Sequence, residues 1–124
     1  MVGLGVVALG VDDVERAAAF WGRALGYVRR EDGWGGWPLS LVPPDGEGTA
    51  IALQRSATPV REHPRTHLDL HVASAAEQEA EVERLVGLGA TRVDWDGYDE
   101  DSDFVVLADT EGNRFCVVDL SFPH

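Results

Sequence analysis

The sequence contains one cysteine, few basic residues and no long apolar segment, and each of these features excludes some classes of protein. A single cysteine, Cys116, excludes a disulfide within the chain and suits a reducing compartment, so we expect a cytoplasmic protein. No segment approaches the ~20 consecutive apolar residues of a membrane span. The apolar N-terminus lacks a basic segment and soon reaches Asp12 and Asp13, so we interpret it as a buried strand and not as a signal peptide.

Basic residues are also scarce. Ten Lys and Arg residues stand against 22 Asp and Glu residues, which gives a net charge of −12. Such a charge repels phosphate backbones and anionic lipids, so we expect neither nucleic acid nor a membrane as a partner. A cationic small molecule would be attracted, although a high net charge also serves solubility alone.

Several familiar catalytic motifs are missing. The sequence shows no Ser/His/Asp order, no P-loop and no dinucleotide-binding fingerprint, because the glycines at 3, 5 and 10 do not follow the strand-to-helix GxGxxG plan. Any function must therefore be sought in the fold and its pockets.

What is present is a repeat. In the first half, apolar alternation and turn residues predict strands at 7–11, 27–31, 39–42 and 49–55, with a helix from a capping box at Asp12 and Glu15 to Gly26. In the second half they predict strands at 68–72, 91–95, 104–109 and 114–120, with a helix from a capping box at Ser74 and Glu77 to Gly89. Each half therefore reads β-α-β-β-β, which indicates a duplicated module.

The two halves are expected to form a single domain of 124 residues. Module one covers about 1–56 and module two about 66–124, and the linker 57–65 holds Pro59 and Pro64. Neither half alone would bury much core, so we interpret the linker as joining modules and not independent domains.

Three segments, in this order, resemble the vicinal oxygen chelate superfamily, which contains glyoxalase I, bleomycin-resistance proteins and extradiol dioxygenases. They are VALGVDDVERAAAFWGRALGY (7–27), HLDLHV (67–72) before a helix ending in LGA (88–90), and VLADTEGNRFCVVD (106–119). The last is similar to the family's D-P-x-G-N turn, with Thr110 in place of proline, and the closest likeness is to glyoxalase-like domain proteins. The resemblance implies an α+β fold in which two paired βαβββ modules form an open, curved mixed β-sheet cup with helices outside. It also implies a small-molecule ligand in the cup and a homodimer.

In the metal enzymes of this family, the first and last strands of each module supply the ligands. The corresponding positions here fall on Val6, His67, Cys116 and a residue near Ala52, with Gln54 two positions further along. Valine and alanine cannot coordinate a metal, and cysteine replaces a hard oxygen with soft sulfur. A catalytic ion needs about three protein ligands and an open position. We therefore expect no metal and no cofactor.

HLDLHV places His67, Asp69 and His71 on one face of a strand. His67 and Asp69 could share a zinc ion, but the α-carbons of His67 and His71 are roughly 14 Å apart in a strand, which is too far. The alternative is a hydrogen-bonding wall. His67 is our candidate catalytic residue, as a general base.

Other candidate ligand-binding residues are aromatic, polar or thiol side chains. GWGGWP (33–38) places Trp34 and Trp37 among glycines, where they could form a wall for a ring or simply cover the barrel or a dimer contact. Gln54 and Cys116 complete the predicted set with His67 and Asp69. A nucleophilic Cys116 would need a lowered pKa, from His67 or Arg114, and a packed wall residue is the alternative. Tyr98, in the acidic loop 96–103, is a candidate lid.

Three functions follow. The first is a small-molecule-binding glyoxalase-like protein without the family metal. The second is a divalent-metal-dependent lyase, isomerase or dioxygenase, which rests on the family and on His67. The third is an antibiotic-sequestering protein like the bleomycin-resistance members, which the acidic charge would suit.

Overall fold

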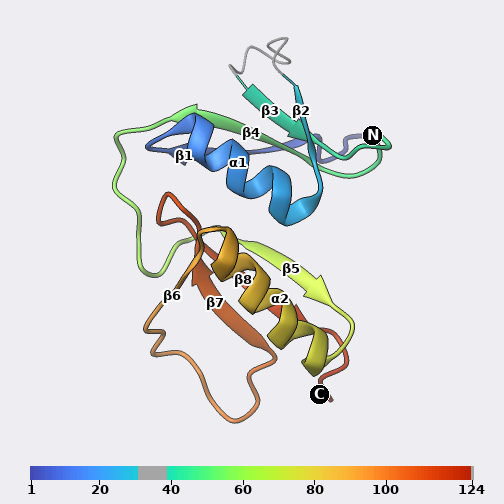
Figure 1. Ribbon diagram of the computed structural model, residues 1–124, viewed down its shortest axis with the longest axis vertical. Helices are drawn as coiled ribbons and strands as arrows, with labels where there is room; N and C mark the ends of the chain where they lie inside the picture. The colour runs from blue at the N-terminus through green and yellow to red at the C-terminus, as the bar shows by residue number, and fades with distance from the viewer. Residues whose placement is uncertain (31–38, 124) are drawn as a thin grey trace. The chain divides into compact units, whose positions relative to one another are not determined.

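The computed structural model of the chain describes residues 1–30 and 39–123. The chain divides into two compact units, Met1–Pro59 and Val60–His124, each with one helix on one mixed sheet (Figure 1). The described elements confirm the α+β class and the two βαβββ modules. Two predictions remain predictions: that the modules close into one cup, and that the whole chain is a single domain.

The first unit contains four strands and one helix within the described residues. They are β1 (Val6–Val11), α1 (Val14–Leu25), β2 (Val28–Arg30), β3 (Leu39–Val42) and β4 (Ala50–Arg55). The sheet order is β1-β4-β3-β2, with β1 and β4 parallel and the other pairs antiparallel. Trp21 of α1 is 1% exposed, which places it in the core as its helical spacing suggested.

The second unit repeats this plan. Its elements are β5 (Leu68–Val72), α2 (Ala75–Leu88), β6 (Thr91–Arg92), β7 (Phe104–Ala108) and β8 (Arg114–Asp119). The order is β5-β8-β7-β6, with β5 and β8 parallel. The strand predicted for 91–95 is shorter than expected, because the chain leaves the sheet after Arg92 and Trp95 lines a pocket instead.

Local signals set the helix ends. Ser74 caps α2 by accepting a hydrogen bond from the Glu77 amide at 3.1 Å, as the capping box predicted. For α1 the predicted cap, Asp12, was one residue early: Asp13 is the N-cap and accepts from the Arg16 amide at 3.0 Å. Gly26 ends α1 with φ +69°, a left-handed conformation that glycine adopts without steric cost.

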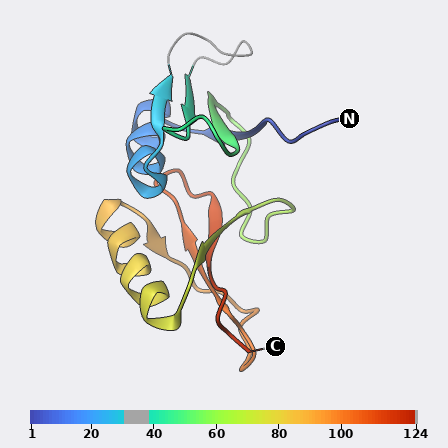
Figure 2. The same cartoon turned by 90° about the vertical axis from the view of Figure 1, so that its right-hand side faces the viewer.

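The sheet of the second unit has one apolar face under α2. Phe115 and Val117 of β8 are 1% and 0% exposed. Helix α2 packs against β8, and its residues Val82 and Leu85 are 3% and 1% exposed. Because side chains alternate along a strand, Arg114, Cys116 and Val118 lie on the opposite face. Figure 2 shows α2 on one side of the strands of its unit, so the face that carries Cys116 is the one that α2 does not cover. No described helix is long and apolar enough to cross a bilayer.

Candidate functional site

Strand register brings the polar residues of the second unit together. Asp69 of β5 pairs with Cys116 of β8, and Cys116 pairs in turn with Val106 of β7. Paired residues share a face, so these three side chains form one row across the sheet, away from α2. His67 precedes β5 by one residue and lies two positions before Asp69, which puts it on the same side.

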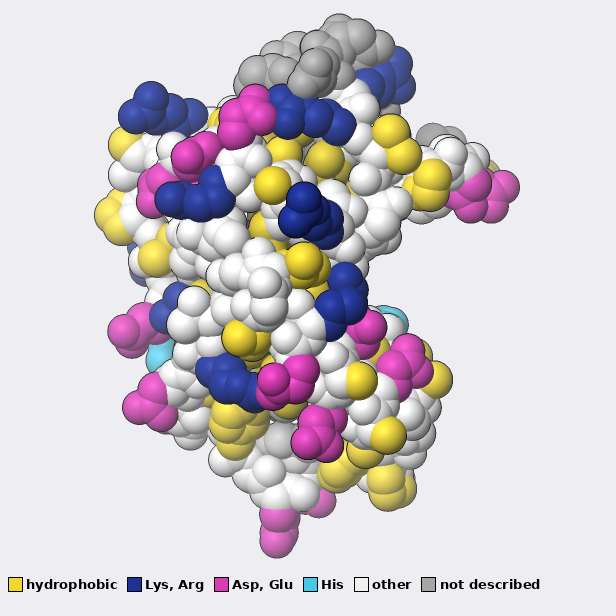
Figure 3. Space-filling model, viewed as in Figure 1, with side chains coloured by type: hydrophobic (Ala, Val, Ile, Leu, Met, Phe, Trp, Pro, Cys, Tyr) yellow, Lys and Arg dark blue, Asp and Glu magenta, His cyan; other side chains and the backbone are white. Residues whose placement is uncertain are grey.

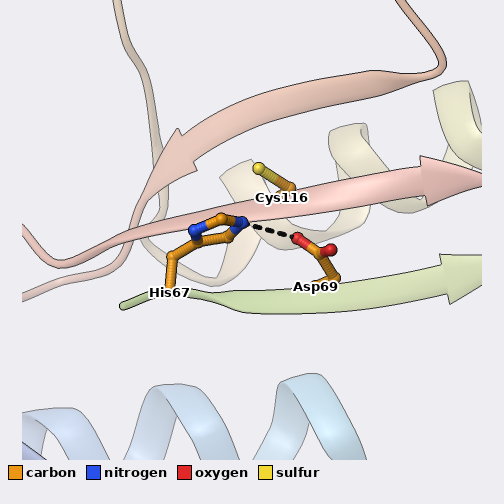
Figure 4. A group of neighbouring side chains, drawn as sticks. All are labelled: His67, Asp69 and Cys116. Carbon is orange, nitrogen blue, oxygen red and sulfur yellow. Dashed lines mark ion pairs between the residues drawn. The ribbon is translucent and has the colours of Figure 1, made fainter. Parts of the chain in front are cut away.

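The side chains of His67, Asp69 and Cys116 gather into a cluster (Figure 4). His67 Nε2 lies 2.9 Å from Asp69 Oδ1. One donor atom from each of the three residues lies within 4.8 Å of the others. The side chains of His67 and Asp69 are 43% and 46% exposed, whereas Cys116 is 9% exposed. The thiol therefore lies at the bottom of the cluster and the imidazole and carboxylate lie toward solvent.

The thiol of Cys116 is held in its protonated form. The pKa of Cys116 is raised from 9.0 to about 12, and burial is the largest cause, followed by the charge of Asp69, a hydrogen bond to Asp69 and the charge of Asp103. A cysteine nucleophile needs a lowered pKa, so this environment opposes the nucleophilic role considered above. The protonated thiol instead serves as a hydrogen-bond donor to Asp69.

The cluster forms part of the floor of a pocket of about 420 Å³ within the second unit. The apolar lining comes from two strands and the loops beside them: Pro64, Trp95, Phe104, Val106 and Val118. The polar lining, besides the cluster itself, is His63, Asp103 and Arg114. A mainly apolar cavity with a few convergent polar groups is the usual form of a small-molecule site.

The loop after β6 supplies the aromatic wall of the pocket. The ring centroids of His63 and Trp95 are 4.7 Å apart, and His63 Nε2 lies 2.9 Å from Asp96 Oδ1. The hydrogen bond with His63 lowers the pKa of Asp96. Tyr98, the candidate lid, accepts a hydrogen bond from the Val106 amide at 2.6 Å and stacks near Phe104, so it is fastened to β7.

A second, smaller cavity of about 280 Å³ adjoins the pocket. The two share His63, Trp95 and Arg114. The remaining lining of the second cavity is entirely acidic: Glu62, Asp94 and Asp96. Trp95 thus lines both a largely apolar cavity and a strongly acidic one.

The predicted site residues have different outcomes. His67, Asp69 and Cys116 lie together in the second unit. Gln54 is an exposed residue of β4 in the first unit, and its part in the site stays a prediction. Trp34 and Trp37 fall outside the described residues. His71, set aside from the sequence, is exposed on β5 beyond the pocket.

The donor atoms of the cluster can also be compared with those that a metal ion requires. It offers one nitrogen, one oxygen and one sulfur from a single unit, a set that suits zinc and leaves room for a further ligand. Two of its members occupy family ligand positions, and Asp69 adds a donor that those positions do not include. In the first unit, Ala52 is fully buried and Val6 carries no donor atom, so neither contributes.

The sequence reasoning missed several strand and loop residues that line the pocket. Phe104, Val106 and Val118 carried a usable signal, because they share the parity of Cys116 across the β7–β8 register. Trp95, His63 and Asp103 carried none, since they lie in loops whose path no periodicity reports.

Comparisons with known proteins agree on one fold. A family model described as the glyoxalase-like domain matches residues 6–118. No curated protein matches the sequence. Among solved structures, a glyoxalase/bleomycin resistance protein/dioxygenase family enzyme from Burkholderia phytofirmans is 16% identical with a TM-score of 0.72, covering 96% of this chain and 99% of that one.

Two further structures are similar to the same extent. A glyoxalase-related enzyme from Fulvimarina pelagi is 18% identical with a TM-score of 0.69, covering 98% of this chain and 90% of that one. The fosfomycin resistance protein FosX from Listeria monocytogenes is 15% identical with a TM-score of 0.70, covering 95% and 91%. At these identities the likeness establishes the fold and leaves the activity to the residues of the site.

Proposed function

Because the chain belongs to the glyoxalase-like domain family of the vicinal oxygen chelate superfamily, we propose that it is a small-molecule-binding protein whose ligand occupies the pocket of the second unit. The observation that carries the proposal is the pocket itself, about 420 Å³ with apolar walls above the His67–Asp69–Cys116 cluster. Its volume suits a ligand of one to three rings. Superfamily members bind their ligands on the concave side of the sheet, which supports the same placement.

The polar and aromatic residues that line the pocket have different roles in this proposal. Asp69 accepts hydrogen bonds from a ligand while holding His67 Nε2 and the Cys116 thiol. Phe104 and Trp95 offer ring faces for stacking. A site built in this way binds by shape, stacking and a few hydrogen bonds, and it needs no metal ion.

A substitution that fills the pocket tests this proposal. We expect the unaltered protein to increase the fluorescence of the neutral dye N-phenyl-1-naphthylamine, and we expect Val118→Trp, which places an indole in the cavity, to abolish that increase. His71→Trp is the matched control, because His71 pairs with Val118 in the register but does not line the pocket. Full dye binding by Val118→Trp, or its loss in the control alone, would place the ligand elsewhere.

A second function has its own observation in favour. The cluster of nitrogen, oxygen and sulfur donors fits a zinc-like ion, which would supply a Lewis acid for the lyase, isomerase or dioxygenase chemistry known in the superfamily. His67, Asp69 and Cys116 would hold the ion. The thiol would first have to lose its proton, because coordination requires the thiolate.

Cobalt titration separates the two functions. If the cluster is a metal site, Co²⁺ should give a sulfur-to-metal charge-transfer band that disappears in Cys116→Ser and persists in His71→Ala. The absence of that band at stoichiometric Co²⁺ would contradict the metal-dependent enzyme and leave the binding protein. A stoichiometric band would instead contradict the metal-free reading.

We also propose a cytoplasmic homodimer without nucleic-acid or membrane partners. The superfamily fold and the acidic charge support this assembly and these exclusions. Light scattering behind a sizing column checks the dimer, since a mass of 13.4 kDa would contradict it.

A further inference from the structure

The negative charge of the molecule is concentrated in one unit. Val60–His124 holds 15 of the 22 acidic residues but only five of the ten basic ones, all of which are arginines. Figure 3 draws the helix side of the second unit, where acidic side chains lie among arginines. By this count the second unit carries most of the negative charge of the molecule, and it attracts a cation more strongly than the first unit does.

The same imbalance holds inside the two adjoining cavities. Five carboxylates line them, and the one permanent cation among their lining residues is Arg114. Its Nη1 already donates to the Gly112 carbonyl at 2.9 Å. Asp69 and Asp103 lie in the larger cavity and Glu62, Asp94 and Asp96 in the smaller.

The raised pKa of Cys116 agrees with this distribution of charge. Burial raises its pKa first, and the charges of Asp69 and Asp103 add to that effect. The guanidinium of Arg114 lines the same pocket but does not reverse it. The pocket floor is thus negative as well as its rim, and it disfavours an anion.

The aromatic lining residues indicate which chemical group of the ligand carries the cation. Trp95 lines both cavities, with His63 stacked at 4.7 Å, and Phe104 lies in the larger cavity. Asp94 and Asp96 flank Trp95 in the chain and both line the smaller cavity. Trp95 is therefore common to the cavity that could hold a ring and to the cavity that carries three carboxylates.

We propose that the ligand is an amine carrying an aromatic ring, with the ring in the larger cavity and the ammonium group in the acidic one. This inference rests on the proposed binding function and adds the chemical class of the ligand. Within the described part of the chain, neither Glu62 nor Asp94 forms an ion pair, so both carboxylates are available to the ammonium group. Trp95 would stack on the aromatic ring and would attract the ammonium group through a cation–π interaction.

Three probes that differ only at one end test the charge. They are 2-(1-naphthyl)ethylamine, 2-(1-naphthyl)ethanol and 3-(1-naphthyl)propanoate, compared by isothermal titration calorimetry at low salt. We expect the amine to bind about tenfold more tightly than the alcohol, since two exposed ion pairs are worth about that factor, and the propanoate to bind most weakly. Raising the ionic strength should remove most of the difference.

A charge-matched pair of variants locates the ammonium group. Glu62→Gln/Asp94→Asn should weaken the amine about fivefold to tenfold and leave the alcohol unchanged. Glu100→Gln/Asp101→Asn removes the same charge from two exposed residues of the loop that contains Asp94, neither of which lines a cavity, and it should leave both affinities nearly unchanged.

The outcomes separate this inference from the function on which it rests. Equal binding of amine and alcohol, tighter binding of the propanoate, or equal weakening by both double variants would overturn the amine and leave the pocket. If none of the three probes bound, and Val118→Trp left dye binding intact, the proposed pocket would fail together with the inference.

Discussion

Asp69 and Cys116 face each other across the parallel pairing of β5 and β8, and after burial the charge of Asp69 is the largest cause of the raised pKa of the thiol. The register makes this contact unavoidable, because paired residues point to the same side of the sheet. Asp69 also lies 2.9 Å from His67 Nε2, so one carboxylate links an imidazole and a thiol. The chemistry of the pocket floor therefore depends on Asp69 more than on either neighbour.

Asp69→Asn tests this dependence. Removing the charge removes a cause of the raised pKa of Cys116, so the thiol should ionise at lower pH than in the unaltered protein, although burial still keeps its pKa above 9.0. Thiolate absorbance near 240 nm, followed during an alkaline titration, measures the change. Asp103→Asn should produce a smaller change of the same sign, because its charge is the last and smallest cause. An unchanged titration in Asp69→Asn would mean that burial alone holds the proton.

The raised pKa of Cys116 also makes stability depend on pH. The unfolded thiol ionises near 9.0 and the folded one near 12, so the folded state gains nothing from this group below pH 9 and loses stability as pH rises toward 12. By pH 10 the loss should be about 1 kcal/mol of unfolding free energy. Urea unfolding at pH 8, 9 and 10 measures it.

Cys116→Ser is the control for that measurement. Serine keeps a hydrogen-bond donor but does not titrate, so the part of the pH dependence that comes from Cys116 should vanish. The chain contains no lysine, which leaves few other groups to titrate in this range. Parallel curves for the two proteins would contradict a raised pKa.

The fold could be predicted from the sequence because its signals are local and appear twice. Alternation in 68–72, the cap at Ser74 and the stop at Gly89 each correspond to an element that the structure contains. The error at Asp12 shows the limit of such signals: two adjacent aspartates both fit a cap, and only the backbone conformation selects Asp13. The early end of β6 depends on the packing of Trp95, which no local pattern encodes.

The candidate site was predicted only in part. Strand residues such as Asp69 and Cys116 could be placed because parity and register fix the side to which they point. The loop residues that shape the pocket could not, since Trp95 and Asp103 are positioned by contacts between segments distant in sequence. The carbonyl of Asp103, for example, is held by the side chain of Gln78 in α2.

Gln78 offers a test of that long-range contact. Its Nε2 donates to the carbonyls of Asp103 and Val117 at 3.0 and 2.9 Å, which joins α2 to β8 and to the loop before β7. Gln78→Leu removes both hydrogen bonds and should lower the unfolding free energy by about 1–2 kcal/mol. Glu79→Leu makes a similar change on the exposed side of the helix and should have a much smaller effect, measured by urea unfolding. Equal losses in the two variants would assign the effect to surface hydrophobicity.

Gly97 controls the position of the Trp95 indole. A Cβ atom added at Gly97 would lie 2.7 Å from Trp95 Nε1, closer than real contacts allow, so Gly97→Ala must displace the ring. Because Trp95 lines both cavities, we expect this variant to lose most binding of N-phenyl-1-naphthylamine while its far-ultraviolet circular dichroism is unchanged. Gly87→Ala is the control, since its new Cβ meets open space in α2 and alanine favours a helix by up to about 1 kcal/mol. That variant should unfold at slightly higher urea and bind the dye normally. Normal binding by Gly97→Ala would remove Trp95 from the wall of the site.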